Sequence, residues 1–197
     1  QPRWRQIVEA EMPELAAAMD AAGAARYNPL DLIPEEVIGP RGVRDGECTA
    51  LTARRPVAES ASASVAEATP GVTVRRGVAI AGLDVGPPAA SGIPHVRGVI
   101  TDTGEVIPAD LVVDTTGRRS PLPAWLEAAG ARRPIEEEDD LGFQYYGRHF
   151  RSEDGSLPAL IAGLLQAYDS VSILTLPADN GTWGVGFTTS AADSDLR

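Results

Sequence analysis

ADLVVDTTGRRSPLPAW, residues 109 to 125, is the stretch from which the fold of this chain can be worked out. Its aliphatic run, Leu111 to Val113, is typical of a strand buried on both faces. The run ends at Asp114 and continues into two threonines, a glycine and two arginines. Free N–H groups in a turn before a helix bind anionic groups. The segment therefore predicts a strand end that holds a phosphate or a sugar-alcohol chain, and an ordinary capped strand end is the alternative.

Four residues of this turn are candidate ligand contacts. Asp114 is expected to accept hydrogen bonds from sugar hydroxyls, while Thr115 and Thr116 offer hydroxyl and main-chain N–H groups. Gly117 permits backbone conformations closed to other residues and has no side chain to block a ligand. A short helix is expected to follow over residues 121–129.

Hydrophobic periodicity on either side of this stretch predicts helices first and strands later. A helical pattern over 3–22 is interrupted by Pro13, which predicts two helices. Residues 49–68 are expected to start as a strand and continue as a helix, whereas 28–47 reads as a loop with short strands. The remaining predictions are strands at 72–77 and 78–86, a surface connection at 86–94, a hairpin over 95–113 with its turn at 102–104, strands at 141–150, 171–177 and 181–190, and either a helix or a strand at 157–168.

Composition excludes several classes of function. The 197 residues carry a formal net charge of −11, which argues against nucleic acid or an anionic membrane as a partner. All 17 basic residues are arginine, so no step within this sequence can use a lysine amine. The single cysteine, Cys48, cannot form an intrachain disulfide or a cysteine-rich zinc site, and no metal is expected. No apolar run is long enough to span a membrane, and a cytoplasmic protein is expected.

The segment ADLVVDTTGRRS resembles the second flavin-contacting motif of the FAD-dependent monooxygenase and reductase superfamily. That group includes aromatic hydroxylases, geranylgeranyl-reductase-like enzymes and flavin-dependent halogenases. The family pattern is an apolar strand followed by Asp-Ala-Thr-Gly or a variant of it. This chain has Thr115 where alanine is commoner.

The resemblance continues on both sides of the motif. TARRPVAESASASVAEATPGVTVRRGVAIAGL is similar to the family's segment of arginine, helix, short strand and crossover hairpin. In that family an arginine at the helix start reaches the ribityl–pyrophosphate region of the flavin. By position this is Arg54, with Arg55 the second candidate. PLPAWLEAAG and GFQYYGRHFR resemble the stretch leading into the substrate domain, and TLPADNGTWGVGF resembles a strand pair of that domain.

One family motif does not occur in these residues. The family opens with a strand and a Gly-x-Gly-x-x-Gly turn that holds the ADP part of FAD. Gly181, Gly184 and Gly186 do not have that spacing and are expected in a strand pair. The sequence is therefore interpreted as an interior piece of a longer polypeptide, which by itself would bind FAD poorly or not at all and would be inactive.

The resemblance implies an α+β fold: part of an FAD-binding α/β domain and an antiparallel-sheet substrate domain. Residues 1–50 would form a helical and loop segment near the substrate domain. Residues 51–130 would form the partial FAD-binding domain, and residues 131–197 an incomplete substrate domain. The oligomeric state stays open.

The implied function is that of a flavin-dependent oxidoreductase. NAD(P)H would reduce FAD, and the reduced flavin would support hydroxylation or reduction of a small organic substrate. Candidate substrate contacts are Tyr145, Tyr146, Arg148 and Trp183, with core packing as the alternative. Halogenation fits less well because that group uses a lysine. A hypothesis of another class is a non-catalytic ligand-binding module with a relic flavin site.

Overall fold

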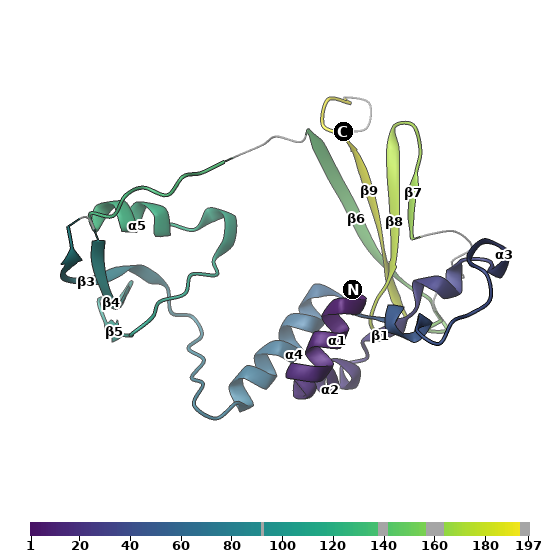
Figure 1. Cartoon of the computed structure of the whole chain (residues 1–197), viewed down its shortest axis with the longest axis horizontal. Coiled ribbons are helices and arrows are strands. Elements are labelled where there is room, and N and C mark those ends of the chain that lie inside the picture. The colour runs from purple at the N-terminus through teal and green to yellow at the C-terminus, as the bar shows by residue number, and fades with distance from the viewer. Residues whose placement is uncertain (92, 138–141, 157–163, 194–197) are drawn as a thin grey trace. The chain divides into compact units, whose positions relative to one another are not determined.

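The computed structural model describes residues 1–91, 93–137, 142–156 and 164–193, and it divides the chain into two compact units. Unit 1 combines Gln1–Thr73 with Leu141–Arg197, and unit 2 is Val74–Asp140. Helices and antiparallel sheets make up the described structure (Figure 1), which confirms the α+β class. These boundaries after residues 73 and 140 differ from the expected ones after residues 50 and 130. The expected assignment of a cofactor domain and a substrate domain stays a prediction.

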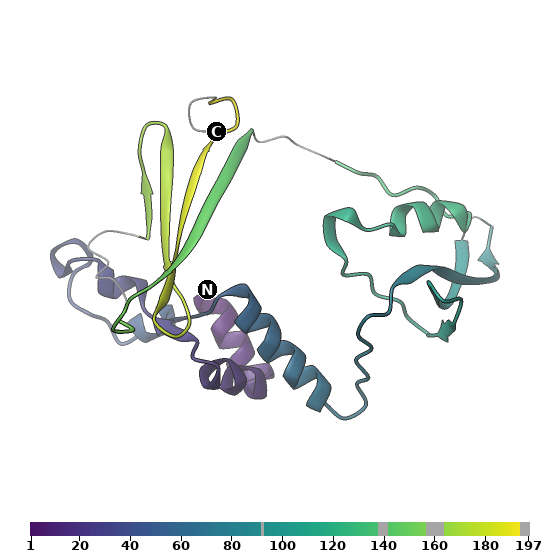
Figure 2. The same ribbon diagram turned by 180° about the vertical axis from the view of Figure 1, so that it is seen from behind.

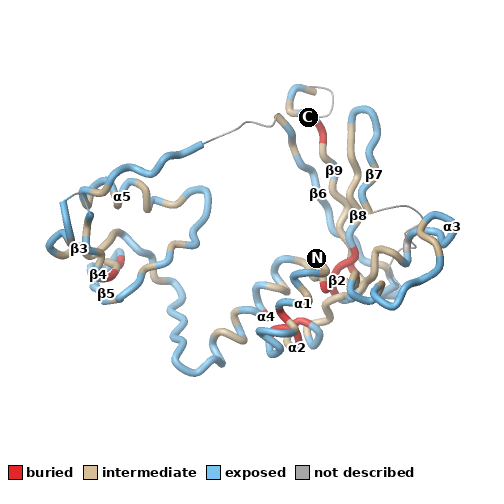
Figure 3. Tube along the Cα trace, in the orientation of Figure 1, coloured by how far each residue is buried: buried red, intermediate tan, exposed pale blue. Residues whose placement is uncertain are grey.

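Three helices of unit 1 pack together around a small apolar core. The sequence predicts the break between α1 (Pro2–Glu11) and α2 (Pro13–Ala21) correctly, because proline is tolerated only in the first turn of a helix. The third helix, α4 (Arg55–Ala68), begins with Pro56 in its first turn, as expected. Most of the buried apolar residues lie in this region (Figure 3), and the core cluster consists of Val8, Leu15, Ala16, Met19, Leu51 and Ala61.

The segment between α2 and α4 contains short helices where short strands were expected. Strand β1 (Ala25–Tyr27) pairs antiparallel with β2 (Ala50–Thr52). The side chain of Asn28 accepts a hydrogen bond from Leu30 N, and such local bonds favour turns over strand ladders. The intervening elements are η1 (Pro29–Leu32), α3 (Glu35–Ile38) and η2 (Asp45–Cys48).

A four-stranded antiparallel sheet completes unit 1, with the order β6-β9-β8-β7. Figure 2 shows it from behind, with β9 between β6 and β8. The three predicted strands are confirmed as β6 (Phe143–Arg151), β8 (Val171–Pro177) and β9 (Thr182–Ser190). The undecided segment 157–168 lies partly outside the described residues and ends in β7 (Leu165–Ala167).

Unit 2 contains a three-stranded antiparallel sheet, β3 (Ile80–Ala90), β4 (Ile93–Thr101) and β5 (Val106–Pro108). Its hairpin turn at 102–104 is confirmed. The strand expected at 72–77 is not formed, and the connection expected at 86–94 belongs to the β3–β4 hairpin. Two prolines are tolerated in β3 because it is an edge strand, and the pairing shifts register between Gly86 and Ala90.

The prediction of a strand buried on both faces at 111–113 is wrong for the described structure. These residues follow β5 as irregular chain, and the side chains of Leu111 and Val113 are 79% and 71% exposed. A strand exists only where a neighbour accepts its hydrogen bonds, and no described strand pairs with this run. Helix α5 (Leu122–Ala128) follows the turn, as expected.

Candidate functional site

Arg54, the first flavin candidate, is held by a buried carboxylate. Asp179 is fully buried, and it accepts hydrogen bonds from the Arg54 main-chain N–H at 2.7 Å and from Nη2 at 2.7 Å. The Arg54 Nε lies 3.1 and 3.2 Å from the two carboxylate oxygens. Burial alone would raise the pKa of Asp179, but the hydrogen bonds from Arg54 and Asn180 outweigh it and hold the pKa well below its ordinary value of 3.8. Arg54 therefore fixes the start of α4 to the β8–β9 turn.

The β8–β9 turn that carries Asp179 docks against the end of α2. Asn180 has φ +51° and donates from its main-chain N–H to Gly23 O at 3.0 Å and from Nδ2 to Ala22 O at 2.9 Å. Sequence reasoning missed Asp179 as a partner of Arg54. An aspartate between an alanine and an asparagine gives no sign of a contact 125 residues away.

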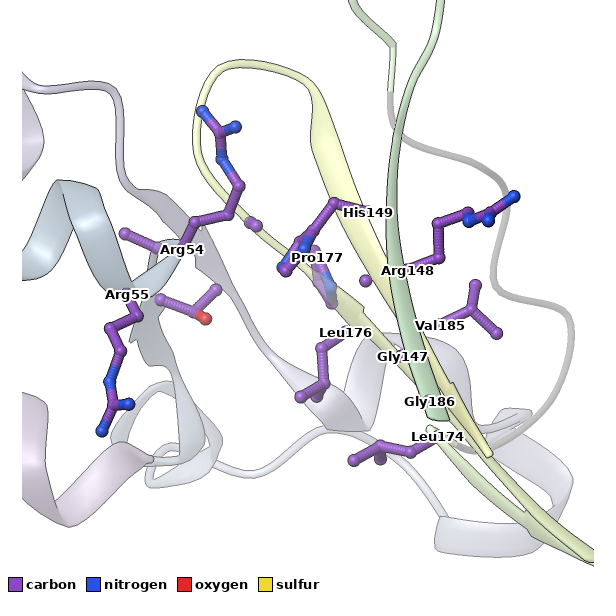
Figure 4. Close-up of a pocket in the computed structure, with 14 residues that line it drawn as sticks. Arg54, Arg55, Gly147, Arg148, His149, Leu174, Leu176, Pro177, Val185 and Gly186 are labelled. Carbon is purple, nitrogen blue, oxygen red and sulfur yellow. The ribbon is translucent and has the colours of Figure 1, made fainter. Parts of the chain in front are cut away.

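Arg55, the second candidate, has a different environment. Its side chain is 87% exposed and makes one ion pair among the described residues, at 3.3 Å to Glu59 on the next turn of α4. In Figure 4 it points away from His149. Exposed i,i+4 pairs contribute little and are readily exchanged. Of the two arginines at the helix start, Arg55 is the more exposed and the one that no buried carboxylate holds.

A pocket of about 380 Å³ lies between this helix start and one face of the four-stranded sheet (Figure 4). The side chains of His149, Leu174 and Leu176 point toward Arg54, whereas Arg148 and Val185 point to the opposite side. This follows from the alternation of side chains along a strand. The lining residues are Thr52, Ala53, Arg54, Arg55, Gly147, Arg148, His149, Leu174, Leu176, Pro177, Ala178, Gly184, Val185 and Gly186.

The sheet separates the four predicted substrate contacts. Tyr145 alternates onto the face of His149 and is 70% exposed. Tyr146, Arg148 and Trp183 share the other face, where the Trp183 ring stacks on Phe150 with centroids 5.9 Å apart. Core packing does not account for Tyr145 and Tyr146 in the described chain, because both are exposed.

The predicted turn after Val113 is organised by Asp114. One carboxylate oxygen accepts from the Thr116 main-chain N–H at 2.8 Å and from its hydroxyl at 2.6 Å. The other accepts from the hydroxyl of Ser120, which in turn accepts from Leu122 N at 3.0 Å. The bonds from Ser120 and then Thr116 lower the pKa of Asp114. Asp114 thus shapes the turn with the oxygens that were expected to contact a sugar.

Thr115, Thr116 and Gly117 are exposed around this carboxylate. Gly117 has φ +80° and no described atom within 4 Å of an added Cβ, so it combines a turn that favours glycine with open space for a ligand. Residues 112–116 also line a pocket of about 550 Å³ within unit 2, together with Leu83, Val99, Trp125 and others from β3, β4 and α5. Thr115, Thr116 and Gly117 are therefore accessible beside this pocket, and their contact with a cofactor stays a prediction.

The predicted cofactor contacts belong to both units: Arg54 and Arg55 to unit 1, and residues 114–117 to unit 2. The described residues contain no cluster of three or more metal-ligating side chains. Within the same residues, no helix has the length and apolar character needed to cross a bilayer. Cys48 is a free, partly exposed thiol.

Comparisons with known proteins give a fold likeness and one partial sequence match. No protein-family model matches the chain. It is 40% identical over 80 residues to Protein Rv3254 of Mycobacterium tuberculosis, a match covering 40% of this chain and 17% of that protein. Its fold resembles BrvH, a flavin-dependent halogenase from Brevundimonas sp. BAL3, with a TM-score of 0.57 and 21% identity. That match covers 93% of this chain and 34% of the halogenase, so the chain spans about a third of its structural relative.

Proposed function

We propose that the intact protein is an FAD-dependent oxidoreductase, a monooxygenase or reductase that acts on a small organic substrate with NAD(P)H as electron donor. The observation that carries the proposal is the likeness to a flavin-dependent fold across 93% of the chain, in both units. The turn at 114–117 adds support, because it resembles the flavin-contacting motif apart from Thr115 and has an open, exposed surface.

Flavin contacts are assigned here by the chemistry of each residue within its own unit. The exposed Arg55 guanidinium would pair with the pyrophosphate, since guanidinium binds phosphate oxygens in a bidentate manner. The Thr115 and Thr116 groups and the main chain at Gly117 would contact the sugar-alcohol chain. Asp114 would hold the shape of that turn, and Arg54 the position of the helix start. The flavin, when bound, supplies the redox chemistry, while the protein orients it and excludes water.

Monooxygenation or reduction is preferred to halogenation for these 197 residues, and a lysine elsewhere in the intact protein would reopen halogenation. All 17 basic residues are arginine, and the halogenase resemblance implies a lysine that handles the halogenating species. Likeness to BrvH at 21% identity concerns the fold and does not extend to the reaction.

The test is the visible absorption spectrum of the intact gene product as purified, with and without added FAD. A flavin spectrum that bleaches on addition of NADPH or NADH, and returns in air, is the expected result. A folded, colourless protein that takes up no FAD would contradict the proposal and favour the non-catalytic binding module. If the flavin spectrum is present, product analysis with chloride or bromide in the assay separates halogenation from hydroxylation.

A further inference from the structure

The β8–β9 turn contains two neighbours, Asn180 and Gly181, that can react with each other. The main-chain nitrogen of the residue after an asparagine can attack the asparagine Cγ, and glycine hinders this attack least because it has no side chain. Asn180 is exposed, and the Gly181 N–H has no hydrogen-bond partner among the residues that the structure describes. The turn therefore holds both atoms that the reaction joins, at a surface that water reaches.

The reaction is a deamidation, and its atoms balance with water alone. A bond forms between Gly181 N and Asn180 Cγ, and the side-chain nitrogen leaves as ammonia together with the proton of the Gly181 N–H. Water then opens the resulting cyclic succinimide at either of its two carbonyl groups. The product is aspartate at residue 180, or isoaspartate, in which the main chain runs through the former side chain. The net change is the hydrolysis of an amide, so it requires no oxidant or reductant.

In the folded protein the end of α2 holds the Asn180 amide in place. Its Nδ2 donates to Ala22 O at 2.9 Å and to a carboxylate oxygen of Asp179 at 3.3 Å. The side chain also lies against Gly23, where an added Cβ would be 2.2 Å from Asn180 Oδ1 and 2.6 Å from its Cγ. Because Nδ2 leaves as ammonia, both of its hydrogen bonds must be given up during the reaction. Docking of the turn on α2 therefore opposes deamidation.

The product of the reaction cannot make the same contacts. The two hydrogens of Nδ2 meet two acceptors, the carbonyl of Ala22 and the carboxylate of Asp179. An ionised carboxylate has acceptor oxygens only, so an oxygen in place of Nδ2 would face both of them without a hydrogen. It would also place a second negative charge beside Asp179, which is fully buried. Deamidation therefore favours a turn that has come away from α2.

We propose that Asn180 is a deamidation site at which opening of the β8–β9 turn becomes irreversible. Docking on α2 protects the amide, opening of the turn releases it for attack by Gly181 N, and the acidic product opposes docking again. Asp179 lies on the same turn, so deamidation also weakens its pairing with Arg54. The proposal concerns unit 1 alone and does not depend on the proposed function.

The first test follows deamidation of the intact gene product at mildly alkaline pH by peptide mass spectrometry. Asn180 is the only asparagine in residues 152–197, so the mass increase of deamidation in that tryptic peptide is assigned by fragmentation to residue 180. Asn28 lies in the tryptic peptide 27–41 and is the internal control. It is followed by Pro29, whose nitrogen carries no hydrogen and cannot form the succinimide.

Deamidation of Asn180 is expected to be slower in the native protein than in guanidinium chloride by roughly tenfold or more, because the reaction needs local opening of the turn. Arg54→Met removes the cation that holds Asp179 and should speed deamidation under native conditions. Arg75→Met, which breaks an exposed ion pair of unit 2, should not. Asn28 should stay unchanged throughout.

The second test compares Asn180→Asp, which is one product of the reaction, with Asn180→Gly. Glycine accepts the φ of +51° at this position and only removes the side chain, so the difference between the variants isolates the effect of the carboxylate. Asn180→Asp is expected to unfold at a lower urea concentration than Asn180→Gly, or to fail to fold where Asn180→Gly folds.

Three results would overturn the proposal. The first is deamidation of Asn180 that is as fast in the native protein as in guanidinium chloride, or that occurs in neither. The second is an Arg54→Met variant that deamidates no faster than Arg75→Met. The third is an Asn180→Asp variant that is as stable as Asn180→Gly.

Discussion

Asp179 is fully buried, and its negative charge is balanced by Arg54. A buried carboxylate that loses its cation keeps the cost of leaving water without the compensating attraction. Arg54→Met retains the apolar stem and removes the guanidinium, so we expect the free energy of unfolding to fall by about 2 kcal/mol. Urea denaturation followed by circular dichroism measures the change.

The matched control is Arg75→Met. Arg75 forms a comparable two-bond pair with Glu105, but that carboxylate is 49% exposed and water replaces the lost partner. Little change in stability is expected for the control. Equal losses in the two variants would show that burial of Asp179 does not set the strength of the pair.

The lowered pKa of Asp179 gives a pH dependence with a definite sign. A carboxyl group whose pKa is lower in the folded protein stabilises the fold above its unfolded value, which is 3.8 here. That contribution is lost as the pH falls below this value through the folded pKa. Asp179→Asn should therefore flatten the decline in stability below about pH 4 and leave its slope near neutral pH unchanged. Urea midpoints between pH 2 and pH 7 provide the measurement, and parallel acid limbs would contradict the assignment.

At the scale of elements, the β8–β9 turn depends on one glycine. Gly181 has φ +67°, and a Cβ there would lie 2.2 Å from Gly155 O. Gly181→Ala is therefore both strained and obstructed, and we expect a loss of more than about 1 kcal/mol in unfolding free energy. Gly46→Ala, where an added Cβ meets nothing within 4 Å and φ is not positive, is the control for thermal unfolding. A Gly181 variant as stable as this control would mean that the turn can re-form in another way.

Elements defined by neighbouring residues were predictable from the sequence. The break at Pro13 and the start of α4 with Pro56 in its first turn follow from local backbone restrictions. The structure of the run at 111–113 was not predictable, because an aliphatic sequence favours a strand but does not show whether another strand lies beside it to pair with. Asp179 was missed for a related reason, since its partner lies far away along the chain. The pairing of Gly147 with Gly186 depends on the register of β6 against β9, which no local pattern gives.

At the scale of the whole molecule, the two arginines of the α4 start are expected to differ in what they do for a flavin. Arg55→Ala should reduce retention of FAD by the intact protein while leaving its unfolding free energy nearly unchanged, because its own ion pair is exposed. Arg54→Ala should lower stability first and retention only as a consequence. Flavin released during gel filtration, measured alongside urea midpoints, separates the two. Equal retention by Arg55→Ala and the parent protein would remove Arg55 from the cofactor site.

Unit 1 is discontinuous, with its segments 1–73 and 141–197 separated by unit 2. Arg54 is consequently synthesised 125 residues before Asp179. At about 5–20 residues per second, a nascent chain carries the start of α4 for roughly 6–25 s before the matching carboxylate has been added. During that interval the Arg54 guanidinium has no Asp179 to pair with. The start of α4 can therefore be fixed to the β8–β9 turn only after that turn has been synthesised.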